Sequence, residues 1–220
     1  TLDRSSAASD VYKRQVLGIL LMGSGIVVSC DSFNEDLPEC RLLVKFKYDY
    51  NMEFADAFHA QVDKVELYIF DKDGKFMFKQ AEEGSALSTG NYLMEVELPV
   101  GQYQFMAWAG ARDSYDITLL TPGVSTITDL KLKLKREASL IINKKMETLW
   151  YGEIIGVNFT GTEHQTETIN LIRDTKIVRF GFQSYTGTWT LDMNDYDYEI
   201  IESNGHLGHD NSLQDDDVLS

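Results

Sequence analysis

The chain has 220 residues, of which 43% are hydrophobic and 11% aromatic, a composition typical of one or two globular domains and not of a disordered chain. Its formal net charge of −15 would repel both nucleic acid and anionic lipid. Nucleic acid is therefore excluded as a partner, and any membrane contact must come through a lipid anchor.

A short apolar segment near the N-terminus has the form of a secretory signal. Lys13 and Arg14 precede an apolar run that begins at Val16 and ends in small residues before Cys30. The run is shorter than the roughly 20 apolar residues that a membrane-spanning helix needs. Its last four residues, Val-Val-Ser-Cys, resemble a bacterial lipobox, where a peptidase cuts before the cysteine and acyl chains are attached to it. The sequence therefore predicts lipidation at Cys30; an ordinary cleaved signal and a buried core helix are the alternatives.

Domain boundaries follow from this prediction. We expect residues 1–29 to be a signal peptide. Residues 1–12 are polar and rich in Ser and Ala, unlike the basic n-region of a signal peptide, and look like a spurious addition to the natural sequence. Residues 30–40 are acidic and aperiodic, as a tether between the lipid and the first strand would be. Residues 41–162 are predicted to form a first β-sandwich domain, and residues 163–220 a partial second one.

Alternation of apolar and polar residues predicts strands through most of the first domain. The predicted strands cover residues 41–50, 61–71, 76–78, 92–98, 102–109, 115–120, 126–136 and 149–159. The sequence Asp-Lys-Asp-Gly at 71–74 predicts a hairpin turn between two of them. A calcium loop is the alternative for Asp71 and Asp73, but the glycine follows too soon and the flanking residues are strands, not helices.

Two further patterns define the expected core. Residues 102–109 are apolar on both faces, which predicts a central strand. Residues 51–60 lose the alternation, and the spacing of Phe54 and Phe58 predicts a short helical crossover there. The inward-facing residues should form the core of one antiparallel sandwich: Leu42, Val44, Phe46, Val65, Leu67, Ile69, Phe105 and Leu132.

The second predicted unit is shorter than the first. Residues 168–171, 176–182, 187–191 and 196–201 resume the alternation, and Asn204-Gly205 is a strong turn signal. Beyond Leu213 the chain is acidic and offers no closing strand. About four strands are too few for a sandwich that buries two faces, so this unit is expected to be incomplete.

The sequence contains no motif typical of an enzyme. It has no zinc-protease H-E-x-x-H, no phosphate-binding loop and no dinucleotide-binding G-x-G-x-x-G between a strand and a helix. We therefore expect no catalytic residue and no cofactor. His206 and His209 lie near Asp210 and residues 215–217, a candidate metal cluster, but the glycine before each histidine favours a loop, so no metal site is predicted.

Several short motifs occur in the order found in one known family. They are Cys30-Asp31-Ser32, Asp36-Leu37-Pro38, Cys40, Tyr48-Asp49-Tyr50-Asn51-Met52, residues 62–71 (V-D-K-V-E-L-Y-I-F-D), Leu98-Pro99-Val100-Gly101-Gln102-Tyr103, Trp108-Ala109-Gly110 and Leu149-Trp150-Tyr151-Gly152. Their order and spacing over nearly all of residues 30–205 resemble the fimbrium anchoring-subunit lipoproteins (the FimB type) of Gram-negative anaerobes.

This resemblance implies tandem transthyretin-like antiparallel β-sandwiches on an outer-membrane lipoprotein, with the lipid on Cys30. It also implies that the protein binds fimbrial shaft subunits, holds them to the cell surface and limits fimbrial length, without catalysing a reaction. Members of the family are longer than this chain, in keeping with the expected incomplete second domain.

A surface glycan-binding lipoprotein of a polysaccharide-uptake system is the alternative function. Such proteins are also lipidated β-sandwiches, and they stack exposed aromatic side chains on sugar rings. Trp108, Trp150 and Trp189 are the candidates for that role. Burial of these tryptophans between sheets would favour the anchor instead.

Overall fold

The structure is a computed structural model that describes the chain from Cys40 to Asp215. Short gaps within this range cover residues 137–141, 143, 184, 186 and 188–191. The predicted signal peptide, the lipidation site Cys30 and most of the predicted tether lie outside the described residues. Among the helices that are described, none has the length and apolar character needed to cross a membrane.

The described part of the chain is almost entirely β, which confirms the all-β fold class. Its strands are β1 (Leu42–Lys47), β2 (Lys64–Asp71), β3 (Phe76–Glu83), β4 (Met94–Val96), β5 (Gly101–Ala109), β6 (Tyr115–Ile117), β7 (Leu132–Leu134), β8 (Trp150–Phe159), β9 (Gln165–Arg173) and β10 (His206–Leu207). The helical elements are short: the α-helix α2 (Phe58–Gln61) and 3-10 turns at Ile127–Asp129 and Met193–Asp195.

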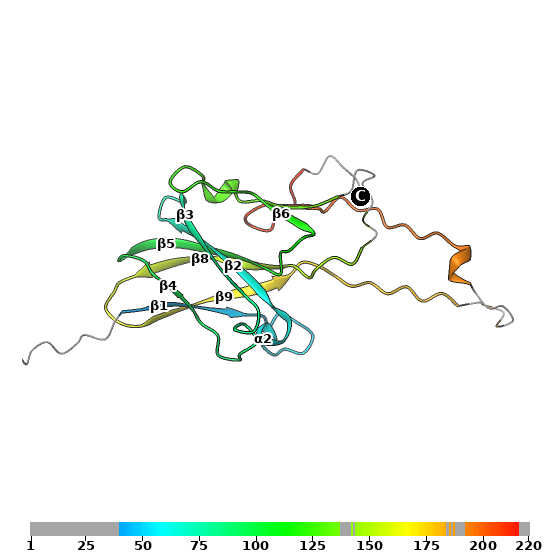
Figure 1. The fold of residues 1–220 in the computed structure, drawn as a ribbon, viewed down its shortest axis with the longest axis horizontal. Coiled ribbons are helices and arrows are strands. Elements are labelled where there is room, and N and C mark those ends of the chain that lie inside the picture. The colour runs from blue at the N-terminus through cyan, green and yellow to red at the C-terminus, as the bar shows by residue number, and fades with distance from the viewer. Residues whose placement is uncertain are drawn as a thin grey trace, which may run out of the picture. The chain divides into compact units, whose positions relative to one another are not determined.

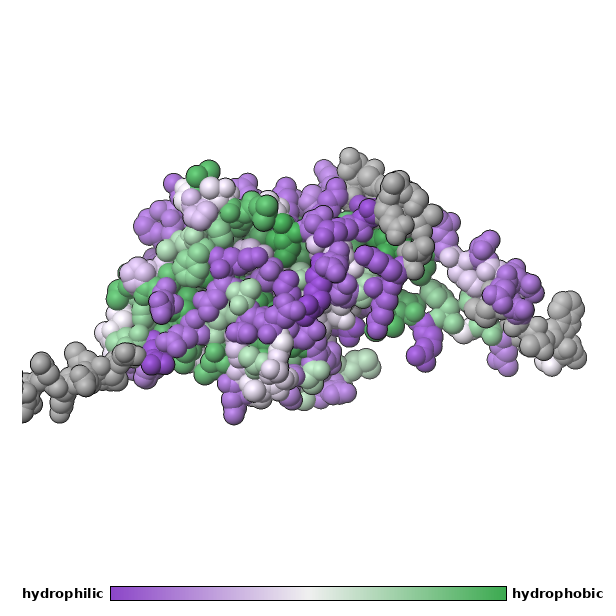
Figure 2. All heavy atoms as spheres, viewed as in Figure 1, coloured by the Kyte–Doolittle hydropathy of each residue, from purple (hydrophilic) through white to green (hydrophobic). Residues whose placement is uncertain are grey.

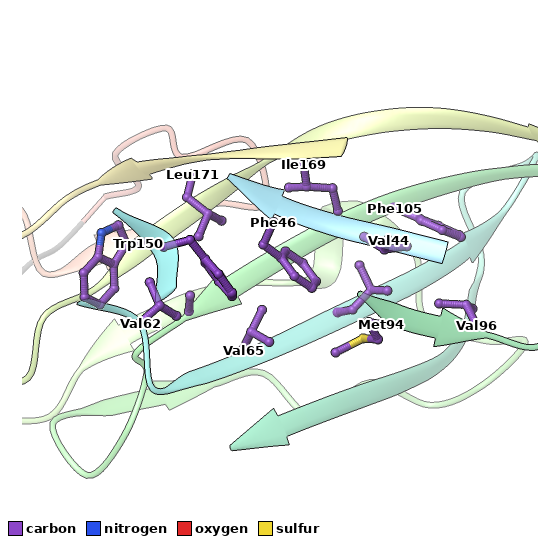
Figure 3. Packing of buried hydrophobic residues seen from close by; sticks show 14 of the residues in the cluster. Val44, Phe46, Val62, Val65, Met94, Val96, Phe105, Trp150, Ile169 and Leu171 are labelled. Atoms are coloured by element: carbon purple, nitrogen blue, oxygen red, sulfur yellow. The ribbon is translucent and has the colours of Figure 1, made fainter. Parts of the chain in front are cut away.

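Seven strands form one sheet in the order β3-β2-β5-β8-β9-β1-β4. β1 runs parallel to β9, from Leu42 opposite Gln165 to Lys47 opposite Asn170, and the other pairs in the sheet are antiparallel. The parallel pair differs from the expected purely antiparallel sandwich, because alternation along a strand sets its faces and does not choose its neighbour. The sheet turns back on itself, so that β1 and β4 lie across a core from β2 and β5 (Figure 1, Figure 3).

The first core lies between these two halves of the sheet. In Figure 3 the labelled side chains point toward one another from β1, β2, β4, β5, β8 and β9 and, for Val62, from the end of α2. Seven of the eight predicted core residues belong to it: Leu42, Val44, Phe46, Val65, Leu67, Ile69 and Phe105. All seven are at most 2% exposed. The alternation therefore identified the inner faces of β1, β2 and β5 correctly.

A second core covers the opposite face of β2, β5 and β8. It is closed by a three-stranded sheet of order β10-β7-β6, which we call the roof sheet (Figure 1). Phe70 of β2 and Trp108 of β5 pack there with Leu132 of β7. Leu132 is buried as predicted, but in this second core and not in the sandwich core, because β7 belongs to the roof sheet. β5 is thus buried on both faces, which confirms it as a central strand.

The hairpin between β2 and β3 forms at the predicted turn. Oδ1 of Asp71 accepts hydrogen bonds from the backbone N–H groups of Asp73 and Lys75, both at 2.9 Å. Gly74 follows with a φ of 76°, a left-handed conformation that glycine adopts at little cost. The side chain of Asp71 therefore stabilises the backbone of the turn through these two hydrogen bonds.

The first unit extends further along the chain than the predicted boundary at residue 163. β9 lies between β8 and β1, and its Ile169 and Leu171 are buried in the first core. This strand belongs to the first unit because its apolar side chains complete that core. Residues 176–182 and 196–201, predicted as strands of the second unit, run as long irregular segments in Figure 1 and belong to neither sheet.

Candidate partner-binding surface

An exposed apolar arm follows β9. We use this name for residues 174–183 and 196–203, which lead away from the seven-stranded sheet and return to the roof sheet (Figure 1). Its large apolar residues are all between 51% and 80% exposed: Ile177, Val178, Phe180, Phe182, Tyr196, Tyr198, Ile200 and Ile201. The rings of Phe182 and Tyr198 lie 5.0 Å apart, so the two segments contact one another. A concentration of exposed apolar side chains of this size marks an interaction site.

A hollow of about 930 Å³ lies at the base of the arm. Leu132 and Leu134 of the roof sheet form one part of its wall, and Val178 and Ile200 of the arm form another. In Figure 2, green hydrophobic surface is visible at the base of the arm between purple hydrophilic side chains. The arm and the roof sheet together therefore offer a concave surface with apolar walls.

Asp174 and Asn211 meet where the arm leaves β9. Nδ2 of Asn211 donates a hydrogen bond of 2.9 Å to Oδ1 of Asp174. Burial raises the pKa of Asp174 to about 6, although the hydrogen bond from Asn211 and the positive charge of Lys176 act in the opposite direction. No sequence pattern marks this pair, because its members are 37 residues apart and meet only through the return of the arm.

A second exposed apolar group lies on the loop that joins β1 to α2. Tyr50, Met52 and Phe54 are each at least 80% exposed. The side chains of Asn51 and Asp56 hold the loop in shape through five hydrogen bonds with neighbouring backbone groups. The helix predicted over residues 51–60 is reduced to α2, and Phe54 lies outside it with a φ of 51°. Such left-handed backbone at a bulky residue is strained, and strain of this kind clusters at functional sites.

The tryptophans that were candidates for sugar stacking are core residues where the structure describes them. Trp108 is 0% exposed and Trp150 is 3% exposed, whereas Trp189 lies outside the described residues. Trp150 packs edge-on against Tyr48, and Trp108 packs in the same way against Tyr151. Neither ring offers a face to a sugar, and their burial favours the anchor over the glycan-binding alternative.

The two histidines near the C-terminus lie in β10 and in the turn that follows it. Nδ1 of His206 lies 3.3 Å from the backbone oxygen of Asp215. Oδ1 of Asp210 accepts hydrogen bonds from the backbone N–H and the hydroxyl of Ser212. Within the described ranges, no three His, Cys, Asp or Glu side chains are grouped so that they could hold a metal ion.

Comparison with known proteins points to a fimbrial protein. Residues 37–220 match the family described as the fimbrillin-A associated anchor proteins Mfa1 and Mfa2. The chain is also 25% identical over 199 residues to the minor fimbrium anchoring subunit Mfa2 of Porphyromonas gingivalis, an alignment that covers 86% of this chain and 59% of that protein.

Two crystal structures of Bacteroides proteins are similar to this structure. A Bacteroides thetaiotaomicron protein provisionally described as polysaccharide binding is 91% identical, with a TM-score of 0.79 over 82% of this chain and 63% of that one. A Bacteroides ovatus protein provisionally described as an adhesin is 31% identical, with a TM-score of 0.70 over 86% of this chain and 63% of that one. The chain thus spans about three-fifths of the length of these relatives. Because the family match covers most of its residues, the chain belongs to the family of fimbrillin-A associated anchor proteins.

Proposed function

We propose that this protein is an outer-membrane lipoprotein that anchors fimbriae to the cell surface and limits their length. The match of residues 37–220 to a family of fimbrial anchor proteins carries this proposal. The relative in P. gingivalis is itself named as an anchoring subunit of a fimbrium. An anchor needs a link to the membrane and a surface that holds the fimbrium, and the chain offers a candidate for each.

The membrane link would be a lipid on Cys30. This cysteine ends a short apolar segment that follows Lys13 and Arg14, and residues 31–39 lead from it toward β1. Several acyl chains on one residue hold a protein to a bilayer far more firmly than a single chain does. Metabolic labelling with a palmitate analogue tests the assignment. The label should be lost in Cys30→Ala and kept in the control Cys40→Ala; label that survives in Cys30→Ala would contradict it.

The surface that holds the fimbrium would be the arm, with fimbrial shaft subunits as its partners. Its apolar side chains are exposed, and its two segments belong to neither sheet. A partner's strand can therefore add to them through the backbone while its side chains cover the apolar ones. In this proposal the protein acts through protein–protein contact and catalyses no reaction, and its charge of −15 keeps nucleic acid away.

We also propose that the arm belongs to a second β-sandwich, which begins after Arg173. Both segments of the arm alternate apolar and polar residues as the strands of the first sandwich do. The relatives are longer than this chain, which spans 59% of one and 63% of two others. In this proposal a partner's strand, added to the arm, covers the alternating apolar faces that are exposed in this chain.

Deletion of the gene tests the anchoring function. Cells without the protein should release fimbriae into the medium and form longer ones, and a wild-type copy should reverse both effects. A copy that carries Phe180→Ser and Ile200→Ser should reach the surface in normal amounts but hold fimbriae poorly. The control copy carries Leu119→Ser and Val124→Ser, which remove apolar side chains that are even more exposed but lie outside the arm.

The same experiment separates the anchor from the glycan-binding alternative. The B. thetaiotaomicron relative is provisionally described as polysaccharide binding, which makes a glycan the first competing ligand to test. If deletion leaves fimbriae attached and of normal length, and the purified protein binds a polysaccharide, the glycan-binding function replaces the anchor.

A further inference from the structure

Among the described residues, hydrogen bonds attach the segment that follows the arm to the rest of the protein at two places. We call residues 204–215 the tail. β10 of the tail pairs with β7, with His206 opposite Lys133 and Leu207 opposite Leu132. The second attachment is the hydrogen bond from Nδ2 of Asn211 to Oδ1 of Asp174. Because the arm leaves at Asp174 and ends before the tail, this bond closes the base of the arm.

The remaining oxygen atoms of this pair present a problem of hydrogen bonding. Oδ2 of Asp174 and Oδ1 of Asn211 are both buried, and neither has a hydrogen-bond partner among the described residues. Both atoms are acceptors when the carboxylate is ionised, so they cannot satisfy one another. Buried acceptors without a donor are destabilising. A proton on Oδ2 of Asp174 would solve both problems at once, because it could be donated to Oδ1 of Asn211.

We propose that Asp174 and Asn211 form a proton-operated clasp at the base of the arm. With the carboxyl protonated, the two side chains make two reciprocal hydrogen bonds, one from the amide N–H to Oδ1 and one from the Oδ2 hydroxyl to the amide oxygen. When the proton leaves, the second bond is lost and the ionised oxygen faces the amide oxygen. The tail is then held more weakly, and the base of the arm opens more often.

The groups around Asp174 allow this titration near neutral pH. Burial raises the pKa of Asp174 to about 6, against the effect of Lys176 on the arm. Tyr115 of β6 and Tyr151 of β8 also face Asp174, and both are neutral phenols whose own pKa values are raised, chiefly by burial. The other charged groups nearby are Asp210 of the tail and, across the hollow, Lys144, Glu199 and Glu202. The clasp is therefore held by two hydrogen bonds while Asp174 is protonated and by one once it is ionised, so the tail is held more weakly as the pH rises through about 6.

Hydrogen exchange of the tail tests the clasp on the full chain. Protection of the amides in residues 206–214, corrected for the intrinsic effect of pH on exchange, should fall at least several-fold between pH 5 and pH 7.5 in the wild-type protein. Asp174→Asn should keep the tail protected at both pH values, because an asparagine makes the same two hydrogen bonds without a proton. Asp174→Ala should lose protection at both. The control Asp197→Asn, the same change on the exposed arm, should behave as the wild type does.

Two results would overturn the clasp. One is wild-type protection that does not change with pH, or that changes equally in Asp174→Asn. The other is a tail in Asp174→Ala that is as well protected as in the wild type, since the side chain would then not hold the tail.

Discussion

The first sandwich and the arm share one sequence pattern but differ in burial. In β9, Ile169 and Leu171 alternate with polar residues and are at most 1% exposed. In the arm, Phe180 and Phe182 alternate in the same way and are 62% and 54% exposed. β9 has a strand on each side and an opposing layer, whereas the arm belongs to neither sheet. Alternation therefore shows that a face is suited to burial, while the surrounding chain decides whether it is buried.

The two regions also differ in how they treat a buried carboxyl group. Glu66 of β2 accepts hydrogen bonds of 3.0 Å from Nζ of Lys79 and from the hydroxyl of Tyr68. Burial would raise the pKa of Glu66, but the hydrogen bond from Lys79 and the charges of Lys79 and Lys64 outweigh it and hold the pKa below its usual value. Asp174 at the base of the arm has the opposite shift, because only Lys176 opposes its burial by charge. The sandwich gives Glu66 the charges of two lysines and a hydrogen bond from one of them, whereas the base of the arm gives Asp174 the charge of Lys176 alone.

The largest difference between the regions is expected at two phenylalanines. Phe105→Ala should lower the free energy of unfolding by about 3–5 kcal/mol, because the ring is fully buried in the first core. Phe180→Ala should change it by less than about 0.5 kcal/mol, because the ring is exposed. Denaturant unfolding of both variants measures the two losses. Similar losses would mean that the arm is packed as tightly as the sandwich.

A pair of glycines tests close packing within the first unit. Gly110 and Gly123 both have a φ of 73°, but a Cβ on Gly110 would lie 2.0 Å from the backbone oxygen of Thr148, whereas nothing lies within 4 Å of a Cβ on Gly123. Gly123→Ala should cost about 1–2 kcal/mol for the left-handed backbone alone. Gly110→Ala should cost about 1–3 kcal/mol more, because the backbone at Thr148 must move. Thermal unfolding compares the stability of the two variants. Equal losses would show that the backbone at Thr148 moves away from the added methyl group at no cost in stability.

The buried charge of the sandwich should be visible in the pH dependence of stability. Glu66→Gln should cost about 1.5–3 kcal/mol at pH 7, because it removes hydrogen bonds to a charged group. Since the pKa of Glu66 is lowered in the folded protein, its contribution is present above the ordinary value of 4.5 and is lost as the pH falls below it. Denaturant unfolding from pH 7 to pH 3 should therefore show a smaller loss in Glu66→Gln than in the exposed control Glu97→Gln. If the two variants lost the same stability between pH 7 and pH 3, the stabilising role assigned to ionised Glu66 would be wrong.

The smallest effect on stability is expected in the arm. Phe180→Ser with Ile200→Ser should change the free energy of unfolding by less than about 0.5 kcal/mol for each substitution, because both side chains are exposed. The same variant should associate less with itself in sedimentation velocity, because exposed apolar surface promotes association. The control Leu119→Ser with Val124→Ser should associate as the wild type does. A large loss of stability in the arm variant would mean that the arm is packed.

The sequence also indicated part of the candidate site. It predicted that residues 176–182 and 196–201 alternate as strands do, and these are the two segments of the arm. It did not indicate that their apolar faces are exposed, because exposure depends on what the rest of the chain covers. Residue spacing predicts a helical crossover over residues 51–60, but Phe54 lies outside α2, since spacing alone does not reveal a left-handed backbone. Lipidation at Cys30 lies outside the described residues and stays a prediction.

Local sequence by itself determined the strands of the sandwich, their inner faces and the turn at Asp71–Gly74. These features depend only on the period of a strand and on the conformations that short turns permit. Only the tertiary structure decided which strands are neighbours. The parallel pairing of β1 with β9, the roof sheet that draws Leu132 into a second core, and the contact of Asp174 with Asn211 all join segments far apart in the chain. Each depends on which surfaces meet in three dimensions, and the alternation along one segment does not specify the surface that will face it.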